Sequence, residues 1–236
     1  MEIPLFEANN GSCPYIKGKE WLSYLTHADQ LDEYVYEALI NKGFRRSGNI
    51  FYQNQCDDCT ACIPIRLISG HFSPSKSQRK ILRKNQDVSF EVKPATFDPE
   101  AFAVYKAFTE ERYNTTVTAD EFQQFLVRSA VDTQMMTYFD RQGKMLAVGW
   151  LDILQDSISS VYFAFDPAES KRSLGTYSVM QELELCKKLD KEHLHLGFWV
   201  ADCQSMVYKS RFYPHQLLVD GQWSPPIMQP PSKDSI

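Results

Sequence analysis

The order of β-rich and helical segments in the second half of the chain limits the fold more than any other sequence feature. Three β-rich runs occupy positions 135–140, 145–154 and 158–165, and only short polar turns separate them. This spacing predicts an antiparallel meander. A segment of helical period follows over 174–189, and a buried-looking strand over 194–200. The second half therefore predicts an α+β fold in which a meander is followed by one helix and one strand.

The remaining segments are shorter and less regular. Helices are expected over 29–41, 75–85, 98–112, 120–128 and 202–212, and strands over 49–53 and 63–68. Pro64 falls in the second strand, which is therefore expected at a sheet edge or with Pro64 at its start. These elements divide the chain into an N-terminal α/β subdomain over 1–70 and a larger domain over 71–224. Residues 225–236 are rich in Pro and Ser and are expected to be a flexible tail.

The composition is that of a folded globular protein. The chain has 236 residues, 43% hydrophobic and 23% charged, so neither wholesale disorder nor a fibrous repeat is expected. The apolar stretches are too short to span a bilayer, and the N-terminus lacks the basic and apolar segments of a secretory signal. The sequence therefore predicts a soluble cytoplasmic protein with no membrane partner.

Six cysteines are present, and three of them fall within seven residues. Clustered thiols in a reducing compartment indicate metal ligation more often than disulfides. A structural zinc ion or an iron–sulfur cluster is therefore predicted at Cys13, Cys56, Cys59 and Cys62. The alternative is a group of small buried thiols without metal. The two other cysteines, Cys186 and Cys203, are expected to be buried structural residues.

A local basic segment stands out in a chain whose formal net charge is −5. Residues 71–94 contain six lysines and arginines against two acids, a local charge of +4. An ordinary solvated helix face mixes both signs of charge, but the helix expected over 75–85 contains no acid. This surface is therefore predicted to bind a nucleic-acid backbone. The predicted contacts are Lys76, Arg79, Lys80 and Arg83.

A loop with a phosphate-binding pattern precedes the helix expected over 174–189. Its sequence is Lys171-Arg172-Ser173-Leu174-Gly175-Thr176. Backbone N–H groups at a helix start, together with an arginine, suit a phosphate. The pattern Arg-x-x-Gly also resembles the pyrophosphate loop of the GCN5-related N-acetyltransferase (GNAT) fold, although alone it is equally consistent with a simple turn. The candidate phosphate ligands are Lys171, Arg172, Ser173 and Gly175.

Ordered motifs along almost the whole chain resemble one known family. They are Cys-Pro-Tyr at 13–15, Gly-Phe-Arg-Arg-Ser-Gly at 43–48, the cysteine segment 56–66, Ser-Gln-Arg at 77–79, Phe-Asp-Pro at 165–167, Arg-Ser-Leu-Gly-Thr-Tyr at 172–177, Leu-Gly-Phe at 196–198, Tyr-Lys at 208–209 and Phe-Tyr-Pro at 212–214. On these motifs the chain resembles the arginyl-tRNA–protein transferases, most closely their shorter bacterial branch, the aspartate/glutamate leucyltransferases. Two places depart from the family patterns. Ile16 replaces a second cysteine of the eukaryotic enzymes, and residues 111–115 replace a bacterial Arg-His-x-x-Gly.

The resemblance implies a fold and a reaction. The fold is a small cysteine-bearing N-terminal subdomain joined to a GNAT-like C-terminal domain that uses aminoacyl-tRNA in place of acetyl-CoA. The reaction is transfer of leucine from Leu-tRNA, favoured over Arg-tRNA, to proteins that begin with Asp or Glu, which marks them for degradation through the N-degron pathway. Because the donor ester is already activated, the chemistry requires no cofactor.

The reaction needs groups for the attacking amine, for the oxyanion and for the acidic acceptor side chain. Tyr208 and Lys209 are the candidate catalytic pair, with Tyr208 donating to the oxyanion or relaying a proton. Arg66 is the first candidate for binding the acceptor acid, followed by Arg45 and Lys209. The loop at 171–175 is expected to bind the terminal adenosine and its phosphates, and the basic helix the acceptor stem.

Three other functions use the same features differently. Arginyl transfer to the same acceptors would change only the donor. An acyl-CoA-dependent N-acetyltransferase would use residues 172–176 for pyrophosphate and leave the basic helix as plain surface. A non-catalytic zinc-bearing RNA-binding module would explain the cysteines and the basic helix, but it would give the C-terminal motifs no purpose.

Overall fold

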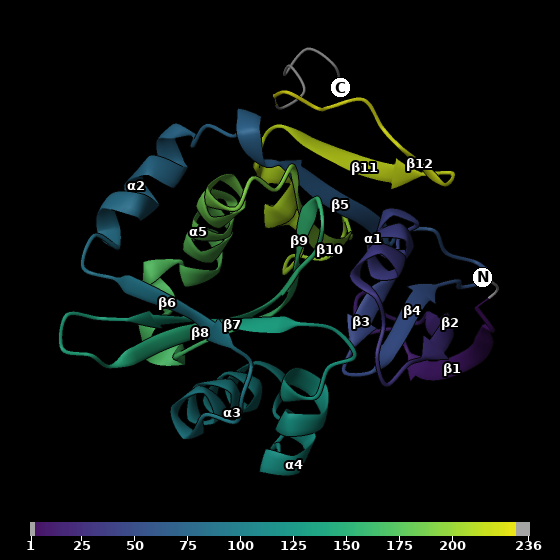
Figure 1. Cartoon of the computed structure of the whole chain (residues 1–236), viewed down its shortest axis with the longest axis horizontal. Coiled ribbons are helices and arrows are strands. Elements are labelled where there is room, and N and C mark those ends of the chain that lie inside the picture. Colours follow the sequence, from purple (N-terminus) through teal and green to yellow (C-terminus); the bar gives the residue numbers. More distant parts are fainter. Residues whose placement is uncertain (1–2, 230–236) are drawn as a thin grey trace.

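Two β-sheets of different size organise residues 3–229, the part of the chain that the computed structural model describes (Figure 1). The smaller sheet is antiparallel throughout and has the order β1-β2-β4-β3. Its strands are β1 (Phe6–Ser12), β2 (Glu20–His27), β3 (Arg45–Ser47) and β4 (Ile50–Asn54). The helix α1 (Glu33–Asn41) contributes Tyr36 and Ile40 to the core that the smaller sheet forms with Phe51.

The larger sheet has the strand order β12-β11-β5-β10-β9-β8-β7-β6. Its strands are β5 (Ile63–Ile68), β6 (Ser89–Pro94), β7 (Thr133–Phe139), β8 (Met145–Ile153), β9 (Ser157–Phe165), β10 (His193–Trp199), β11 (His215–Val219) and β12 (Gln222–Trp223). The antiparallel pairing of β7, β8 and β9 confirms the predicted meander. β10 runs parallel to β9 but pairs with it only at residues 193–195 and 157–159, so the two strands share no ladder beyond these residues.

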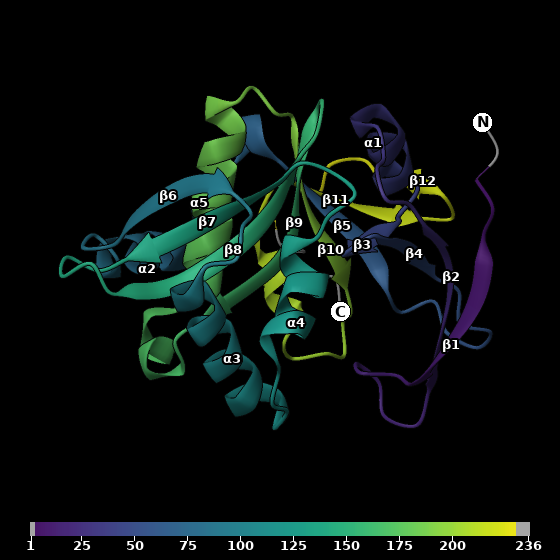
Figure 2. The ribbon, with the colours of Figure 1, turned by 60° about the horizontal axis from the view of Figure 1, so that its bottom comes forward.

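Helices cover both faces of the larger sheet (Figure 2). α5 (Leu174–Lys188) and α2 (Lys76–Lys84) lie on one face, and α3 (Pro99–Tyr113) and α4 (Ala119–Phe122) on the other. A π-helical turn (Gln123–Val127) continues α4. The central strand β8 is buried at eight of its nine positions because both faces are covered. Among the described helices, none is both long and apolar enough to cross a membrane.

The best-defined predicted helices are confirmed, and side-chain caps explain where they begin. At α2, the Ser75 side chain accepts from the Gln78 N–H while the Gln78 side chain accepts from the Ser75 N–H, which satisfies two otherwise free donors. At α3, Asp98 accepts from the N–H groups of Glu100 and Ala101. The Arg-x-x-Gly loop leads into α5, as expected, through a 3₁₀ turn (Pro167–Arg172) and Ser173.

Other sequence expectations need correction. The helix expected from residue 29 begins only at Glu33, because Asp32 caps it by accepting from the Tyr34 N–H. The helix expected over 202–212 is only a 3₁₀ turn (Val207–Arg211). β5 is not an edge strand, since β10 and β11 pair with its two sides; Pro64 is its second residue, which confirms the alternative of a strand start.

The junction between the two sheets lies in the cysteine segment between β4 and β5. The domain limits drawn at residues 70 and 224 stay predictions, although β5 already belongs to the larger sheet. Within the expected tail, Ile227 exchanges backbone hydrogen bonds with His215 at 2.8 and 3.2 Å, so this part is attached to the sheet. Residues 230–236 lie outside the described part of the chain.

Candidate active site

A cavity of about 880 Å³ lies where β9 and β10 cease to pair. The smaller sheet, the end of α3, the outer part of β9, the start of α5 and the segment 204–209 provide its walls. Five residues singled out from the sequence line it: Arg45, Ser173, Gly175, Tyr208 and Lys209. The cavity therefore gathers groups that are far apart along the chain beside the end of a strand, where α/β proteins commonly place ligands.

Arg45 reaches the cavity from β3. Its guanidinium donates to the Ser159 hydroxyl at 3.2 Å and to the Ser160 carbonyl at 2.7 Å. Gly197 makes room for it: the residue has φ +77°, and a Cβ there would lie 2.9 Å from Arg45 Cζ. The register of β10 against β5 shifts between His195 and Phe198, which places this bulge next to the arginine.

Lys209 is half-buried against the same bulge. Its Nζ donates to the carbonyl oxygens of Leu196 and Phe198, both at 2.8 Å, at the place where the register of β10 shifts. Burial lowers the pKa of Lys209 to about 7, and the positive charge of Arg45 adds to this effect. A neutral amine can donate two N–H groups to these carbonyls and still keep its lone pair for a proton.

Tyr208 stands beside Lys209 on the cavity wall. Burial raises the pKa of its hydroxyl to about 12, and the nearby carboxylate of Glu182 contributes to the rise. The phenol therefore keeps its proton at neutral pH and is a hydrogen-bond donor. Together, Lys209 and Tyr208 offer a proton acceptor and a proton donor in one cavity.

The start of α5 forms one lip of the cavity through Ser173 and Gly175, but the neighbouring Arg172 has another role. Its guanidinium donates to both carboxylate oxygens of Asp87 at 2.9 Å and to Glu169 at 2.8 Å. These carboxylates raise the pKa of Arg172 further above its ordinary value. The expectation that Arg172 and Lys171 bind a phosphate is not supported by this geometry, since neither lines the cavity and Arg172 is held by two acids.

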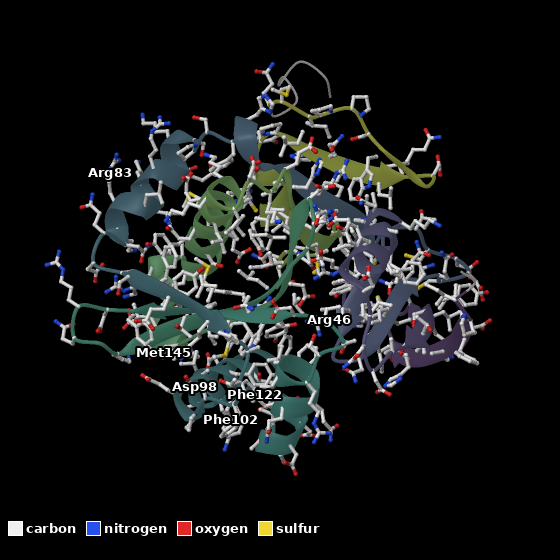
Figure 3. The ribbon with its side chains drawn as sticks, in the orientation of Figure 1. Arg46, Arg83, Asp98, Phe102, Phe122 and Met145 are labelled. Carbon is white, nitrogen blue, oxygen red and sulfur yellow. The ribbon has the colours of Figure 1, made fainter. Side chains whose placement is uncertain are left out.

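The cations of α2 lie on the outer side of that helix, outside the cavity, and Figure 3 shows Arg83 among them. Gln78 is the only buried residue of this helix. Lys76, Arg79, Lys80 and Arg83 therefore form an exposed basic surface. The helix is attached to the cavity lip: Asn85, which ends α2, donates to the Arg172 carbonyl at 3.0 Å.

Arg66, the first candidate for binding the acceptor acid, does not line the cavity. Its guanidinium donates to Gln216 Oε1 at 2.9 Å and to Asn41 Oδ1 at 3.0 Å, and it lies 4.3 Å from the centre of the Trp223 ring. These contacts join β5 to α1, β11 and β12. The prediction for Arg66 is therefore replaced by a structural role, because its donors are used on the far side of β10.

The four cysteines predicted to bind metal are Cys13, Cys56, Cys59 and Cys62. Their thiols interact with nearby backbone: Cys13 Sγ accepts from the Ile16 N–H at 3.4 Å, and Cys56 Sγ from the Leu22 N–H at 3.5 Å. Within residues 3–229 no three His, Cys, Asp or Glu side chains are arranged to hold a metal ion. The predicted zinc or iron–sulfur site does not fit this arrangement, and no step of the reaction is assigned to a metal.

Three charged residues that line the cavity, Arg46, Arg112 and Glu182, were not among the site residues predicted from the sequence. Arg112, at the end of α3, has its guanidinium carbon 5.6 Å from the ring centres of both Phe108 and Tyr113. Glu182, on α5, is 1% exposed and is bonded to the Ser178 hydroxyl. Burial raises the pKa of the Glu182 carboxyl. The available signal for Glu182 was its helical spacing from Val179, Leu185 and Cys186, which places it on the buried face of α5.

Comparison with known proteins identifies the family. The descriptions of the matching family models are "Arginine-tRNA-protein transferase, N terminus", over residues 11–80, and "Arginine-tRNA-protein transferase, C terminus", over residues 100–219. The chain is 35% identical over 216 residues to the aspartate/glutamate leucyltransferase of Marinobacter nauticus, covering 89% of this chain and 91% of that protein. The corresponding protein of Chromobacterium violaceum is 36% identical over 216 residues, with 89% of each chain covered.

These matches place the chain among the aminoacyltransferases. It belongs to the arginine-tRNA-protein transferase family, as its motifs predicted. Among solved structures, a tandem GNAT protein from the clavulanic acid biosynthesis pathway is 12% identical, with a TM-score of 0.44 over 87% of this chain and 58% of that chain. The meander, the following helix α5 and the parallel strand β10 confirm the predicted α+β class and the element order expected for the C-terminal domain.

Proposed function

We propose that this protein transfers leucine from leucyl-tRNA to the N-terminal amine of proteins that begin with Asp or Glu. The observation that carries the proposal is the pairing of Lys209 and Tyr208 in a cavity beside the start of α5. The choice of leucine as the transferred group and of Asp or Glu as the acceptor residue comes from the relatives, which are named aspartate/glutamate leucyltransferases.

In the proposed reaction the neutral acceptor amine attacks the ester carbonyl at the 3′ end of the tRNA. Lys209 accepts the proton that the amine loses, since its pKa of about 7 keeps part of it neutral at physiological pH. Tyr208 donates a hydrogen bond to the oxyanion that develops on the carbonyl oxygen. The ester C–O bond then breaks, the amide bond remains, and the tRNA 3′ oxygen leaves with a proton. The activated ester makes a cofactor unnecessary for this chemistry.

The acidic side chain of the acceptor requires a cation near the attacking amine. Arg45 lines the cavity and forms no ion pair with the described carboxylates, so we assign it this role in place of Arg66. Arg112, at the end of α3, lines the same cavity and is the second cation available to the acceptor. Arg45 also has a fixed orientation, because Ser159 and Ser160 hold its guanidinium.

The tRNA is proposed to approach over α2. This helix carries five exposed cations and no acid, and it is bonded to the lip of the cavity. A phosphate backbone lying on α2 could therefore direct the 3′ end toward Ser173 and Gly175. The cytoplasmic location and the marking of acceptors for degradation stay predictions from the sequence.

The test uses purified protein, separately charged Leu-tRNA and Arg-tRNA, and peptides that begin with Asp, Glu or Asn. Leucine addition to the Asp and Glu peptides but not to the Asn peptide, measured by mass spectrometry, is the expected result. The family takes its name from arginine-tRNA, so arginine addition without leucine addition would support arginyl transfer instead. Acetylation in a parallel reaction with acetyl-CoA would favour an acetyltransferase, and no product in any arm would contradict aminoacyl transfer.

A further inference from the structure

Glu182 is a buried acid that the proposed proton transfers do not use. It lies on the inner side of α5, lines the cavity and is 1% exposed. One carboxylate oxygen, Oε1, accepts the Ser178 hydroxyl. The other, Oε2, has no hydrogen-bond partner among the described residues. A buried carboxylate oxygen without a partner is costly to stability, so its retention in a ligand cavity calls for an explanation.

The surroundings of Glu182 combine apolar side chains with hydroxyl groups, since its carboxylate is close enough to Tyr138 and Tyr208 to raise, in addition to burial, the pKa of both phenols. Four apolar residues line the cavity and also belong to the hydrophobic core between α5 and the larger sheet. They come from β9, α5 and β10: Phe163, Leu174, Val179 and Leu196. Ser160 is half-buried on the cavity wall and lies close enough to Glu182 to lower its pKa slightly against the effect of burial. The cavity therefore combines an apolar wall with one carboxylate and a hydroxyl beside it.

A ligand that fits this chemistry carries a cationic amine next to an apolar side chain. An ammonium group supplies three donors and a positive charge, which would satisfy Oε2 and favour the charged form of the carboxylate. An apolar side chain would contact the surrounding wall. An α-amino acid esterified through its carboxyl group has both features, because its amine remains free.

We propose that Glu182, with the Ser160 hydroxyl, binds the α-ammonium of the leucyl group on the donor tRNA and so selects an aminoacyl ester over other acyl esters. This inference rests on the proposed function and assigns a residue to donor recognition. Glu182 lies seven residues after Gly175, which corresponds to about 10 Å along an α-helix. One helix would thus carry the lip that meets the tRNA end and the acid that meets its aminoacyl group.

The charges of the cavity favour the donor over the acceptor as the partner of Glu182. Acceptors begin with an acidic residue, and a carboxylate facing that residue would repel it. The cations Arg45 and Arg112 line the same cavity and are available to that acidic side chain. Glu182 therefore suits the aminoacyl donor, because the leucyl group has a cationic amine and no carboxylate side chain.

The test compares two donors that differ only at the amine: leucyl-tRNA and its deaminated counterpart, which carries a hydroxyl in place of the α-amine. Both are offered with one Asp-starting peptide to the wild-type protein, to E182Q and to S160A. The wild-type kcat/KM is expected to favour leucyl-tRNA by about tenfold or more, as one charge-assisted hydrogen bond allows. The ratio should approach one in E182Q and fall partly in S160A.

An unchanged donor ratio in E182Q would overturn the proposal, as would equal losses for both donors, which would indicate a general catalytic or structural role. Thermal unfolding of each variant establishes that it is folded. If E182Q did not fold, S160A would decide the question through the same ratio of kcat/KM values for the two donors, because Ser160 is only half-buried. Failure of the proposed function would look different, because the wild-type protein would then transfer neither group.

Discussion

At the scale of single residues, the state of the Lys209 amine controls the proposed reaction. Burial and Arg45 lower its pKa to about 7, whereas an unfolded lysine titrates at 10.5. The folded protein therefore gains the neutral, proton-accepting form as the pH rises through 7. The charged or titratable groups that influence it are Arg45, Cys62 and Cys203.

We expect K209M to lower kcat/KM for leucine transfer by about 10²- to 10⁴-fold, the usual effect of losing a general base. In the wild type, kcat/KM should rise with pH through about 7 and then level off; K209M should lose this step. The acceptor amine also titrates, near pH 8, so the difference between the two profiles is the relevant measurement. K188M, on the exposed side of α5, provides the control. A step that persists in K209M would assign the titration to another group.

A second residue-scale prediction concerns the room that Gly197 leaves for Arg45. In G197A, a Cβ would meet the guanidinium at 2.9 Å in a backbone of φ +77°. G143A is a matched control, because Gly143 has φ +82° but no atom lies within 4 Å of the place that its Cβ would occupy. Both variants should lose about 1–3 kcal/mol of unfolding free energy from backbone strain. Only G197A should also raise KM for Asp-starting peptides, and equal KM values in both variants would contradict the role of Arg45.

At the scale of elements, the sequence predicted those whose patterns are long and buried. β8 and α5 combine many apolar residues with clear turns at their ends, so their period was readable. β1, with the sequence FEANNGS, is largely exposed and polar, and β6 is an exposed edge strand; neither was predicted. Their pairing depends on partner strands and not on a local apolar pattern.

The same distinction explains the candidate site. Tyr208 and Lys209 were found because they lie in a family motif a few residues after a predicted strand, and Arg45 because it lies in another family motif. Arg66 was misplaced because its partners Gln216 and Trp223 lie about 150 residues further along the chain, and no local signal reveals that arrangement. Long-range pairings of this kind follow only from the strand order of the larger sheet.

The basic surface of α2 gives an element-scale prediction. Replacing Lys80 and Arg83 by Gln should raise KM for leucyl-tRNA and reduce the slope of log KM against log salt by about 0.7–0.9 for each phosphate that the helix no longer neutralises. K187Q with K188Q, on the exposed side of α5, removes the same charge elsewhere and is the control. An equal change in both double variants would indicate a general electrostatic effect and remove α2 from the tRNA path.

At the scale of the whole molecule, one buried ion pair joins the two sheets. Arg46, on β3, donates to Asp152 on β8 at 2.8 and 2.7 Å, and Figure 3 shows it between the smaller and the larger sheet. The two side chains are 1% and 0% exposed. Thr133 donates to the same carboxylate at 2.6 Å, so the acid is hydrogen-bonded from two elements. This network fixes the cavity, because Arg45, the neighbour of Arg46, lies in its wall.

R46M should therefore destabilise the protein by about 3–5 kcal/mol, since it leaves the buried Asp152 carboxylate without its cation. Urea unfolding followed by tryptophan fluorescence measures the change. K93M, which breaks the more exposed Lys93–Asp98 pair, should cost only about 0–1 kcal/mol. Because β3 carries both arginines, R46M should also weaken transfer to Asp-starting peptides under conditions in which the variant remains folded. Wild-type stability in R46M would show that the two sheets hold their arrangement without this ion pair.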